Sequence, residues 1–505
     1  MRGMPGGMVA LAAAAALAAG GRPAVATPAR AAAAGHPATI KVAQFNCDIS
    51  DEYAIVPASL VARAIRKSGA DVVGIEEGGG EIPQVARALG WHYYDVRMQI
   101  VSRLPLVDPP AGDGVYTFVQ VAPGRVAALE NVHLPSSPYG PSWVKRGKTL
   151  AQVLAMERRV RLPAIRSRLR AAAGLRARGI PVFLTGDLNS PSFRDWTRAT
   201  VGLRPAIRYP VRWPVSVAIE RAGFTDSFRA VHPNPVRVPG LTWPTHRTLK
   251  GVENFPGWPA DRIDFVYAAG ATTVASRIIG EPGAPGTSAT VAPWPSDHRL
   301  VVSTFRVRGA TPPTLVTVPQ RRVTRGDRVP VSFHSGSAGA SAVLIERFGA
   351  GHPVVVARHG LHAGAAAGIG SVSFSSAGWR PGAYAAVLAG RRGQLSRFPF
   401  WVVAPGAPAI VQTLRPTYAV GQPITVRIRN APGDRWDWLG IYHRHANPLV
   451  AYYLDWIYTR SAIAGRFQLG ANAQGPWPLP PGRYSIYLLR DDLYVKIAGA
   501  DFRIR

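Results

Sequence analysis

The stretch PVFLTGDLNSPS, residues 181–192, contains the pattern that decides the fold. Its apolar beginning predicts a buried strand, which ends abruptly at Gly186-Asp187-Leu188-Asn189 and a Ser/Pro turn. A strand that delivers Asp187 and Asn189 to its exposed end holds two polar groups rigidly at one place. Because Asp and Asn also follow strands as ordinary turn residues, the interpretation depends on whether similar stretches occur elsewhere.

Polar residues stand at the ends of several other apolar runs. The runs are VAQFN, DVVGIEE, ALENVHL and DRIDF, and PWPSDHRLVV places polar residues just before a strand. The resulting set is Asn46, Glu77, His133, Asp187, Asn189, Asp264, Asp297 and His298. Carboxylate and amide oxygens without a thiolate suit a hard divalent cation such as Mg²⁺ or Mn²⁺. A histidine beside carboxylates suits acid/base chemistry and phosphate contacts.

Strands and helices alternate between residues 39 and 308. The apolar spacing predicts strands over 40–45, 71–75, 116–121, 126–133, 262–267 and 300–307, and helices over 58–67, 82–89 and 150–169. The helix over 150–169 has an arginine-rich outer face, which is typical of a solvated surface. Mixed strands and helices around a sheet core predict an α/β sandwich.

The GDLN, RIDF and SDHR segments, in this order, resemble the signatures of the endonuclease/exonuclease/phosphatase superfamily. This is the fold of the pancreatic-type deoxyribonucleases, neutral sphingomyelinases and inositol-polyphosphate phosphatases. The resemblance covers residues 39–308. It implies a four-layer α/β sandwich with two packed mixed sheets, a site at the edge that the sheets share, and a Mg²⁺-dependent phosphodiesterase activity, with Mn²⁺ as the alternative metal.

The resemblance also implies a metal site. Glu77 would be the principal metal carboxylate, Asn46 would lie beside the metal, and Asp297 would approach the metal or the water. Glu76 stands where the family usually has glutamine, which suggests a supporting position behind the ligands.

The catalytic roles follow from the same resemblance. His133 would contact the phosphate or the leaving group, and Asp187 would orient or deprotonate the attacking water. Asn189 would hold the phosphoryl oxygens, and Asp264 would orient His298 as an acid partner orients an imidazole.

The character of the sequence changes after about residue 309. Helical periodicity disappears, and short strands alternate with Pro/Gly turns, which predicts β-sandwiches. Segments such as PGAY at 381–384 and PGRY at 481–484 recur at an offset of about 100 residues. We therefore predict two all-β, Ig-like modules, residues 310–406 and 407–505, after a phosphoesterase domain over 36–309.

The N-terminal 35 residues predict a secretory signal peptide and leader. Arg2 precedes a short Ala/Leu-rich run, and Ala24-Val25-Ala26 resembles a cleavage site. This predicts a secreted, extracellular protein. Cys47 is the single cysteine, so no internal disulfide can form, and its apolar strand context favours packing.

The formal net charge of +30 leaves two interpretations open. It favours attraction to polyanions such as nucleic acid, anionic lipid or cell wall, or it reflects an arginine-favouring composition. Only six of the 59 basic residues are lysine, and the excess is spread over the whole chain. Charge alone therefore does not locate a site.

Three substrates agree with the predicted chemistry. A secreted nuclease suits the positive charge and is the leading hypothesis. A sphingomyelinase-like phospholipid phosphodiesterase suits the aromatic loops at 91–94, 141–143 and 254–259, although such rings also stack on bases or pack under loops. A phosphomonoesterase comes third.

A binding protein is the alternative from another class. The C-terminal modules would then bind carbohydrate or a cell-surface ligand through residues 435–438 and 452–456, beside an accessory phosphoesterase domain. Because none of the eight polar residues is missing, we favour an active enzyme with accessory modules. We expect a monomer.

Overall fold

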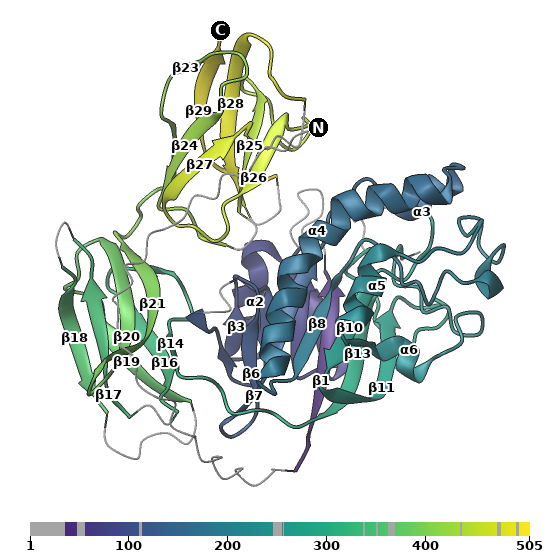
Figure 1. Ribbon diagram of the computed structural model, residues 1–505, viewed down its shortest axis with the longest axis horizontal. Coiled ribbons are helices and arrows are strands. Elements are labelled where there is room, and N and C mark those ends of the chain that lie inside the picture. The colour runs from purple at the N-terminus through teal and green to yellow at the C-terminus, as the bar shows by residue number, and fades with distance from the viewer. Residues whose placement is uncertain are drawn as a thin grey trace, which may run out of the picture. The chain divides into compact units, whose positions relative to one another are not determined.

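Two mixed β-sheets pack face to face in the N-terminal part of the computed structural model (Figure 1). The order of the first sheet is β12 (Ala289–Thr290), β11 (Ala271–Gly280), β13 (Leu300–Val307), β1 (Ala38–Asn46), β2 (Val72–Glu76), β4 (Ile100–Ser102) and β3 (Tyr93–Asp95). The order of the second is β5 (Leu106–Val107), β6 (Thr117–Ala122), β7 (Arg125–His133), β8 (Val182–Asp187), β10 (Asp264–Ala269) and β9 (Thr225–Asp226).

The structure describes residues 36–47, 56–110, 114–245, 255, 257–336, 339–349, 352–361, 369–434, 437–471, 476–490 and 494–505. The predicted signal peptide and leader lie outside these residues, as do Arg435, Trp436 and most of the loop at 246–256. Within the described residues, no helix has the length and apolar character needed to cross a membrane.

Alternating side chains of the strands build the core between the two sheets. Val42, Val72, Leu129, Phe183 and Phe305 are among the buried residues that meet there. This alternation is the period-two pattern from which the strands were predicted.

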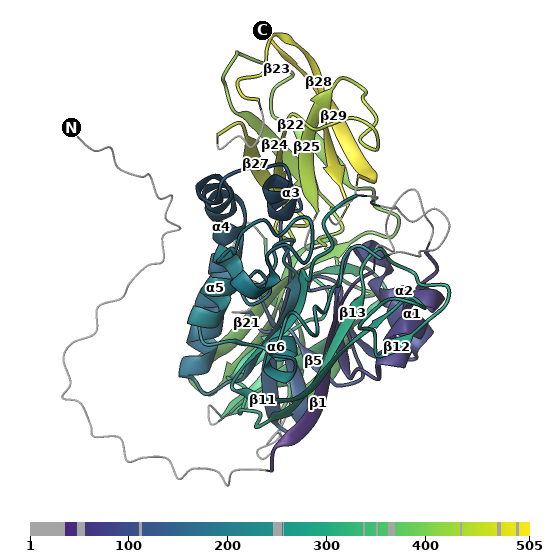
Figure 2. The same ribbon diagram turned by 90° about the vertical axis from the view of Figure 1, so that its right-hand side faces the viewer.

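Helices cover the outer face of each sheet. The helices α1 (Ala58–Ser68) and α2 (Ile82–Leu89) bury their apolar sides on the first sheet, and α4 (Leu150–Ala177) and α5 (Pro214–Arg221) do so on the second. Figure 2 shows these two pairs on opposite sides of the sheets. The four layers confirm the predicted α/β sandwich.

The helix α4 is longer than the sequence pattern predicted. It begins at a capping box, in which Thr149 accepts from the backbone N–H of Gln152, and it continues past residue 169 to Ala177. The extension is rich in alanine, a strong helix former, and the chain leaves the helix at Gly179, whose φ is 73°.

Strand register brings the ends of five segments to one edge. In the parallel pair β1–β2, Asn46 is opposite Glu76. In the parallel pair β7–β8, His133 is opposite Asp187, and in the antiparallel pair β8–β10, Asp264 is also opposite Asp187. Polar residues separated by up to 218 positions, Asn46 and Asp264, therefore meet at the same level of the sandwich.

The C-terminal part contains two β-sandwich modules with the same topology. Module 1 has a three-stranded sheet with the order β14 (Leu315–Thr317), β16 (Arg328–His334) and β19 (Gly370–Ser375). Its five-stranded sheet has the order β15 (Arg322–Thr324), β21 (Gly393–Val403), β20 (Gly382–Gly390), β17 (Ala340–Arg347) and β18 (Val354–Gly360). Module 2 repeats the three-stranded sheet as β22 (Ile410–Thr413), β24 (Ile424–Arg429) and β27 (Gly465–Leu469). It repeats the five-stranded sheet as β23 (Thr417–Tyr418), β29 (Lys496–Ile504), β28 (Gly482–Leu489), β25 (Trp438–His443) and β26 (Asp455–Tyr458). The shared strand order agrees with the predicted internal repeat; the domain boundaries stay predictions.

Candidate active site

The predicted residues lie together at the strand ends. The Asp187 carboxylate is at the centre: its Oδ2 accepts from Asn46 Nδ2 at 3.2 Å and lies 3.6 Å from His133 Nε2 and 3.7 Å from His298 Nε2. The backbone N–H of Asn189 donates to the other oxygen of Asp187 at 2.8 Å. One buried carboxylate thus has neighbours from three other segments and from its own.

The imidazole of His298 is oriented by Asp264. Its Nδ1 lies 3.0 Å from Asp264 Oδ2 and 3.2 Å from Oδ1. The other ring nitrogen, Nε2, lies between Asp187 and Asp297, 3.7 Å from Asp187 Oδ2 and 3.8 Å from Asp297 Oδ2. Ser296 fixes the backbone, since its hydroxyl donates to the Asn46 carbonyl and accepts from the N–H of His298.

The side chain of Gln44 connects Asp264 to Glu76. Its Nε2 donates to Glu76 Oε2 at 2.6 Å and to Asp264 Oδ1 at 2.8 Å. Burial raises the pKa of Glu76 well above its ordinary value, and the hydrogen bond from Gln44 offsets only part of this shift. A raised pKa favours protonation, and a protonated Glu76 would resemble the glutamine that the family usually has at this position.

The residues predicted to hold a metal offer oxygens in a suitable arrangement. Asn46 Nδ2 donates to Glu77 Oε1 at 2.9 Å, while Asn46 Oδ1 is buried and accepts no hydrogen bond from the described residues. A buried amide oxygen without a donor beside a carboxylate fits a hard divalent cation. Asn46 and Glu77, with Asp297 close enough for Glu77 to raise its pKa, are the residues that would hold such an ion.

A second group of donor atoms lies close together. One atom each from Asp187, Asp264 and His298 lies within 4.8 Å of the other two. Because His298 and Asp264 already share a hydrogen bond, we interpret this group as the acid/base part of the site.

The local backbone places two of these side chains at a conformational cost. Glu77 and Asn189 have φ values of 53° and 45°, which are uncommon for residues other than glycine. Gly186 is needed for close strand approach, because a Cβ there would lie 2.1 Å from the carbonyl oxygen of Val132. Strained backbone of this kind is typical of functional sites.

An aromatic wall borders the site. The indole Nε1 of Trp243 donates to Asp297 Oδ2 at 2.7 Å, and the Trp243 ring lies 6.0 Å from that of His298. Tyr139, Phe255 and Trp258 pack against Trp243 at ring-centroid distances of 5.1–5.6 Å. Trp258 remains 46% exposed, so the wall ends in a ring that solvent reaches.

The comparisons with known proteins agree with this geometry. The model of the Endonuclease/Exonuclease/phosphatase family matches residues 43–298, just over half of the chain. The chain belongs to the endonuclease/exonuclease/phosphatase family. This confirms the resemblance seen in the sequence and makes the protein a hydrolase of that family.

The individual proteins that this chain resembles are distant from it. An uncharacterized Caenorhabditis elegans protein, F14F9.5, is 30% identical over 174 residues, which cover 33% of this chain and 55% of that relative. An endonuclease/exonuclease/phosphatase from Beutenbergia cavernae is 18% identical over 72% of this chain and 100% of that chain, with a TM-score of 0.33. An endonuclease/exonuclease/phosphatase family protein from Bacteroides thetaiotaomicron is 13% identical over 54% of this chain and 97% of that chain, with a TM-score of 0.31.

The pKa values of the side chains at the candidate active site depend on burial and on the crowding of carboxylates. Burial raises the pKa of Asp187 to about 6, partly offset by the nearby His298. Burial also raises the pKa of Asp297 to about 6, and Glu77 adds to this shift. Burial alone would lower the pKa of His298, but Asp264, Asp297 and Asp187 raise it well above its ordinary value.

Three supporting residues of this family site were not predicted. Gln44 had a detectable signal, because it lies two residues before Asn46 and so shares its face of the strand. Ser296 lies inside the SDHR segment, where only its neighbours were singled out. Trp243 had no local signal, since its role depends on a contact with a residue 54 positions away.

Proposed function

We propose that this protein is an exported, divalent-cation-dependent phosphodiesterase whose preferred substrate is nucleic acid. The observation that carries the proposal is the position of Asp187 between the His298–Asp264 pair and the Asn46–Glu77 oxygens. Hydrolysis of a phosphodiester needs a water held by a base and a way to offset charge on the phosphoryl oxygens. Both kinds of group converge here.

The chain's own residues divide the work of hydrolysis. Asp187, with a pKa raised to about 6, is matched to accept a proton from water near neutral pH. Asn189 keeps Asp187 in place through its N–H, and its side-chain Nδ2 lies 3.2 Å from His133 Nε2. Asn189 and His133 are thus the candidates to hold the phosphoryl oxygens.

His298 supplies positive charge beside Asp187, with its Nε2 3.7 Å from Asp187 Oδ2. Its raised pKa favours the imidazolium, and Asp264 stabilises that form and sets the ring orientation. A protonated Nε2 stabilises an oxyanion by donating a hydrogen bond. A divalent cation held by Asn46, Glu77 and Asp297 would supply further charge stabilisation of the phosphate.

A groove of about 950 Å³ supports nucleic acid as the substrate. One wall begins at Phe193, four residues after Asn189, and the lining includes Arg198 and Arg212, which are exposed. The Arg212 guanidinium lies 5.0 Å from the centroid of the Phe193 ring. Arginines beside an aromatic ring are typical of surfaces that bind a phosphate backbone and stack on bases.

A phospholipid is the second candidate, favoured by the aromatic wall. Trp258 is half-exposed and packs on Trp243, which donates to Asp297. An indole at the rim of a site suits the interface of a lipid surface as well as a base. Export, proposed from the N-terminal sequence, agrees with either substrate.

The test offers four substrates to the full chain in parallel. Duplex DNA, RNA, sphingomyelin vesicles and an aryl phosphodiester are incubated with Mg²⁺ at about 5 mM, a level suited to a weak oxygen site, or with EDTA. We expect cleavage of nucleic acid that EDTA abolishes. Cleavage of vesicles alone would replace the nuclease proposal with the lipid one. If no substrate is cleaved in a cation-dependent way, the proposal that this protein is a phosphodiesterase is contradicted.

A further inference from the structure

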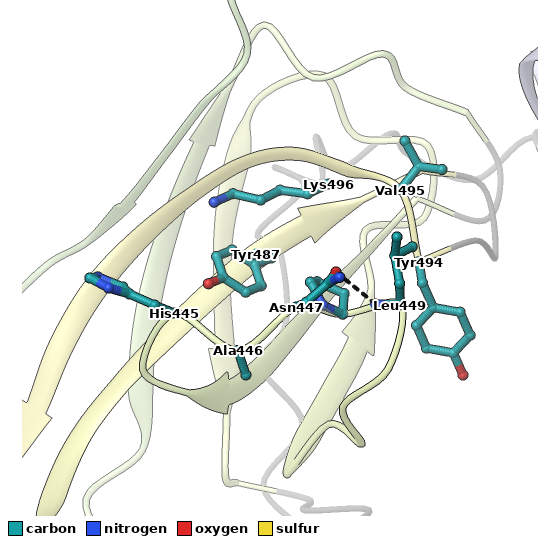
Figure 3. A pocket seen from close by; sticks show the side chains of 9 residues that line it. His445, Ala446, Asn447, Leu449, Tyr487, Tyr494, Val495 and Lys496 are labelled. Carbon is teal, nitrogen blue, oxygen red and sulfur yellow. Dashed lines mark hydrogen bonds between the residues drawn. The ribbon is translucent and has the colours of Figure 1, made fainter. Parts of the chain in front are cut away.

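Module 2 carries a pocket of about 420 Å³ on one face of its five-stranded sheet. Its lining comes from residues 445–449, which follow β25, from Tyr487 on β28, and from residues 494–496 at the start of β29. Figure 3 shows Lys496 above Tyr487, with Leu449, Tyr494 and Val495 at the rim. This pocket has no part in the candidate active site.

Large apolar side chains are concentrated around this pocket. The exposed fractions are 37% for Leu449, 78% for Val450, 91% for Tyr452, 40% for Tyr494 and 42% for Val495. They come from the two segments that line the pocket or from residues directly after them. A grouped set of exposed apolar side chains marks a site of interaction rather than an ordinary surface.

The rings beneath this apolar rim are packed against one another. Trp438 is only 4% exposed, and Tyr453 and Trp456 meet it edge to face at ring-centroid distances of 5.5 Å and 6.4 Å. These rings belong to the set predicted to stack on sugars, but here they form the support of the rim. The segment at 449–452 is therefore held on a packed base.

The polar groups at the pocket favour an anionic partner. The Lys496 ammonium lies 4.3 Å from the centroid of the Tyr487 ring, which holds it beside the apolar rim. Arg444 and His445 both contact Asp501, at 3.3 Å and 2.8 Å, so this carboxylate offsets the charge of Arg444 and the positive charge at the pocket comes from Lys496. Residues 407–505 contain twelve Lys/Arg and six Asp/Glu, a net charge of +6.

We propose that module 2 docks on the surface of a phospholipid bilayer that contains anionic headgroups. Leu449, Val450 and Val495 would enter the boundary of the acyl chains. Tyr452 and Tyr494 would lie at the headgroup level, where amphipathic rings are favoured. Lys496 would contact the phosphates. A carbohydrate explains this rim less well, because aliphatic side chains offer nothing to sugar hydroxyls.

The experiment measures binding of the full chain to sedimented vesicles in EDTA, which stops any hydrolysis. The vesicles are pure phosphatidylcholine, or phosphatidylcholine with about 30 mol% phosphatidylglycerol. We expect binding to the anionic vesicles and weaker binding to the neutral ones. The double variant Val450→Ser/Tyr452→Ser should weaken binding to the anionic vesicles at least about tenfold, and Lys496→Gln about fivefold.

The control replaces two exposed apolar residues of the same module outside the rim. Leu414 and Val420 are each 46% exposed, so Leu414→Ser/Val420→Ser also removes exposed apolar surface from module 2, although less than the rim variant removes. This variant should bind like the wild type. Equal loss in the control, or no binding of the wild type to anionic vesicles, overturns the proposal. Retention on insoluble polysaccharide that only the rim variant loses would overturn it in favour of a glycan.

Discussion

Asp187 is the residue on which the proposed chemistry depends most. It is 1% exposed, and two histidines and two asparagines surround it. Local strand geometry accounts for Asp187 and Asn189 being at the same edge. The proximity of His298, which is 111 residues away, depends on the pairing of β13 with β1.

Replacing Asp187 or His298 with alanine should lower the hydrolysis rate at least about 100-fold, the scale of a positioned acid/base group. Each change removes one partner of the 3.7 Å contact between them. The rate is measured at saturating substrate for both variants, with melting curves to establish that they fold. Near-normal turnover of a folded variant would remove the role assigned to that residue.

Asp261 predicts a pH effect on stability. It is buried and accepts from Trp196 Nε1 and the Tyr139 hydroxyl, and burial raises its pKa from 3.8 to about 6. The folded state therefore favours the protonated form, so this residue adds stability as pH falls through about 6 towards 4, and the contribution is lost as pH rises again.

The comparison with Asp261→Asn isolates this effect. The difference in unfolding free energy between wild type and variant should change by about 2 kcal/mol between about pH 7 and about pH 4, in favour of the wild type at low pH. Urea unfolding at several pH values measures it. A difference that stays constant with pH would show that Asp261 does not titrate in this range.

At the scale of elements, a buried ion network joins three segments beside the site. Arg262 lies 2.7 Å from Asp226 and 2.9 Å from Asp195, and Arg229 lies 2.5 Å from Asp195. Arg262 precedes β10. Asp226 caps α6 (Ser227–Val231), which contains Arg229, and Asp195 follows the GDLN segment. The RIDF signature thus contains a structural arginine two residues before Asp264, the aspartate predicted to orient His298.

Arg262→Met should destabilise the α/β sandwich by about 3–5 kcal/mol, because it removes the cation that pairs with the buried Asp226 and leaves Asp195 with Arg229 alone. The matched control is Arg194→Ala. Arg194 pairs with Glu220 at 2.6 Å but is half-exposed, so its loss should cost less than about 1 kcal/mol. Calorimetry on both variants measures the effect, and similar shifts would contradict the network's role.

The groove at residues 193–212 gives a second prediction at this scale. The double variant Arg198→Ala/Arg212→Ala should raise KM for duplex DNA at least about tenfold and reduce its salt dependence, while turnover of an aryl phosphodiester stays unchanged. Arg166→Ala/Arg170→Ala on the exposed side of α4 removes the same charge away from the groove. Equal effects of the two double variants would mean that only net charge matters.

The repeated modules show what sequence similarity predicts well. Tyr384 donates to the carbonyl of Arg380 at 2.7 Å, and Tyr484 donates to that of Pro480 at 2.7 Å. The PGAY and PGRY segments that revealed the repeat therefore form the same local structure. The rim of module 2 has no such signal, because exposed apolar residues in a loop look like strand residues in a sequence.

At the scale of the whole molecule, a bound cation should stabilise the fold by mass action. Glu77, Asp187, Asp264 and Asp297 gather negative charge at one edge. An ion that binds only the folded state raises the melting temperature with its concentration. Mg²⁺ or Mn²⁺ should therefore raise it in a thermal melt, and Glu77→Gln should remove the increase. An equal increase in that variant would place the ion elsewhere.

The sequence by itself determined the division into an α/β part and an all-β part, the family, and the polar residues that end the strands. The strands and the polar residues at their ends follow from local periodicity, which decides the face on which a side chain lies. The family follows from the resemblance of the GDLN, RIDF and SDHR segments. Only the tertiary structure decided that Trp243, Gln44 and Ser296 support the site, and that module 2 has an apolar rim. Strand order and sheet packing set the distances between remote segments, and no local pattern contains those distances.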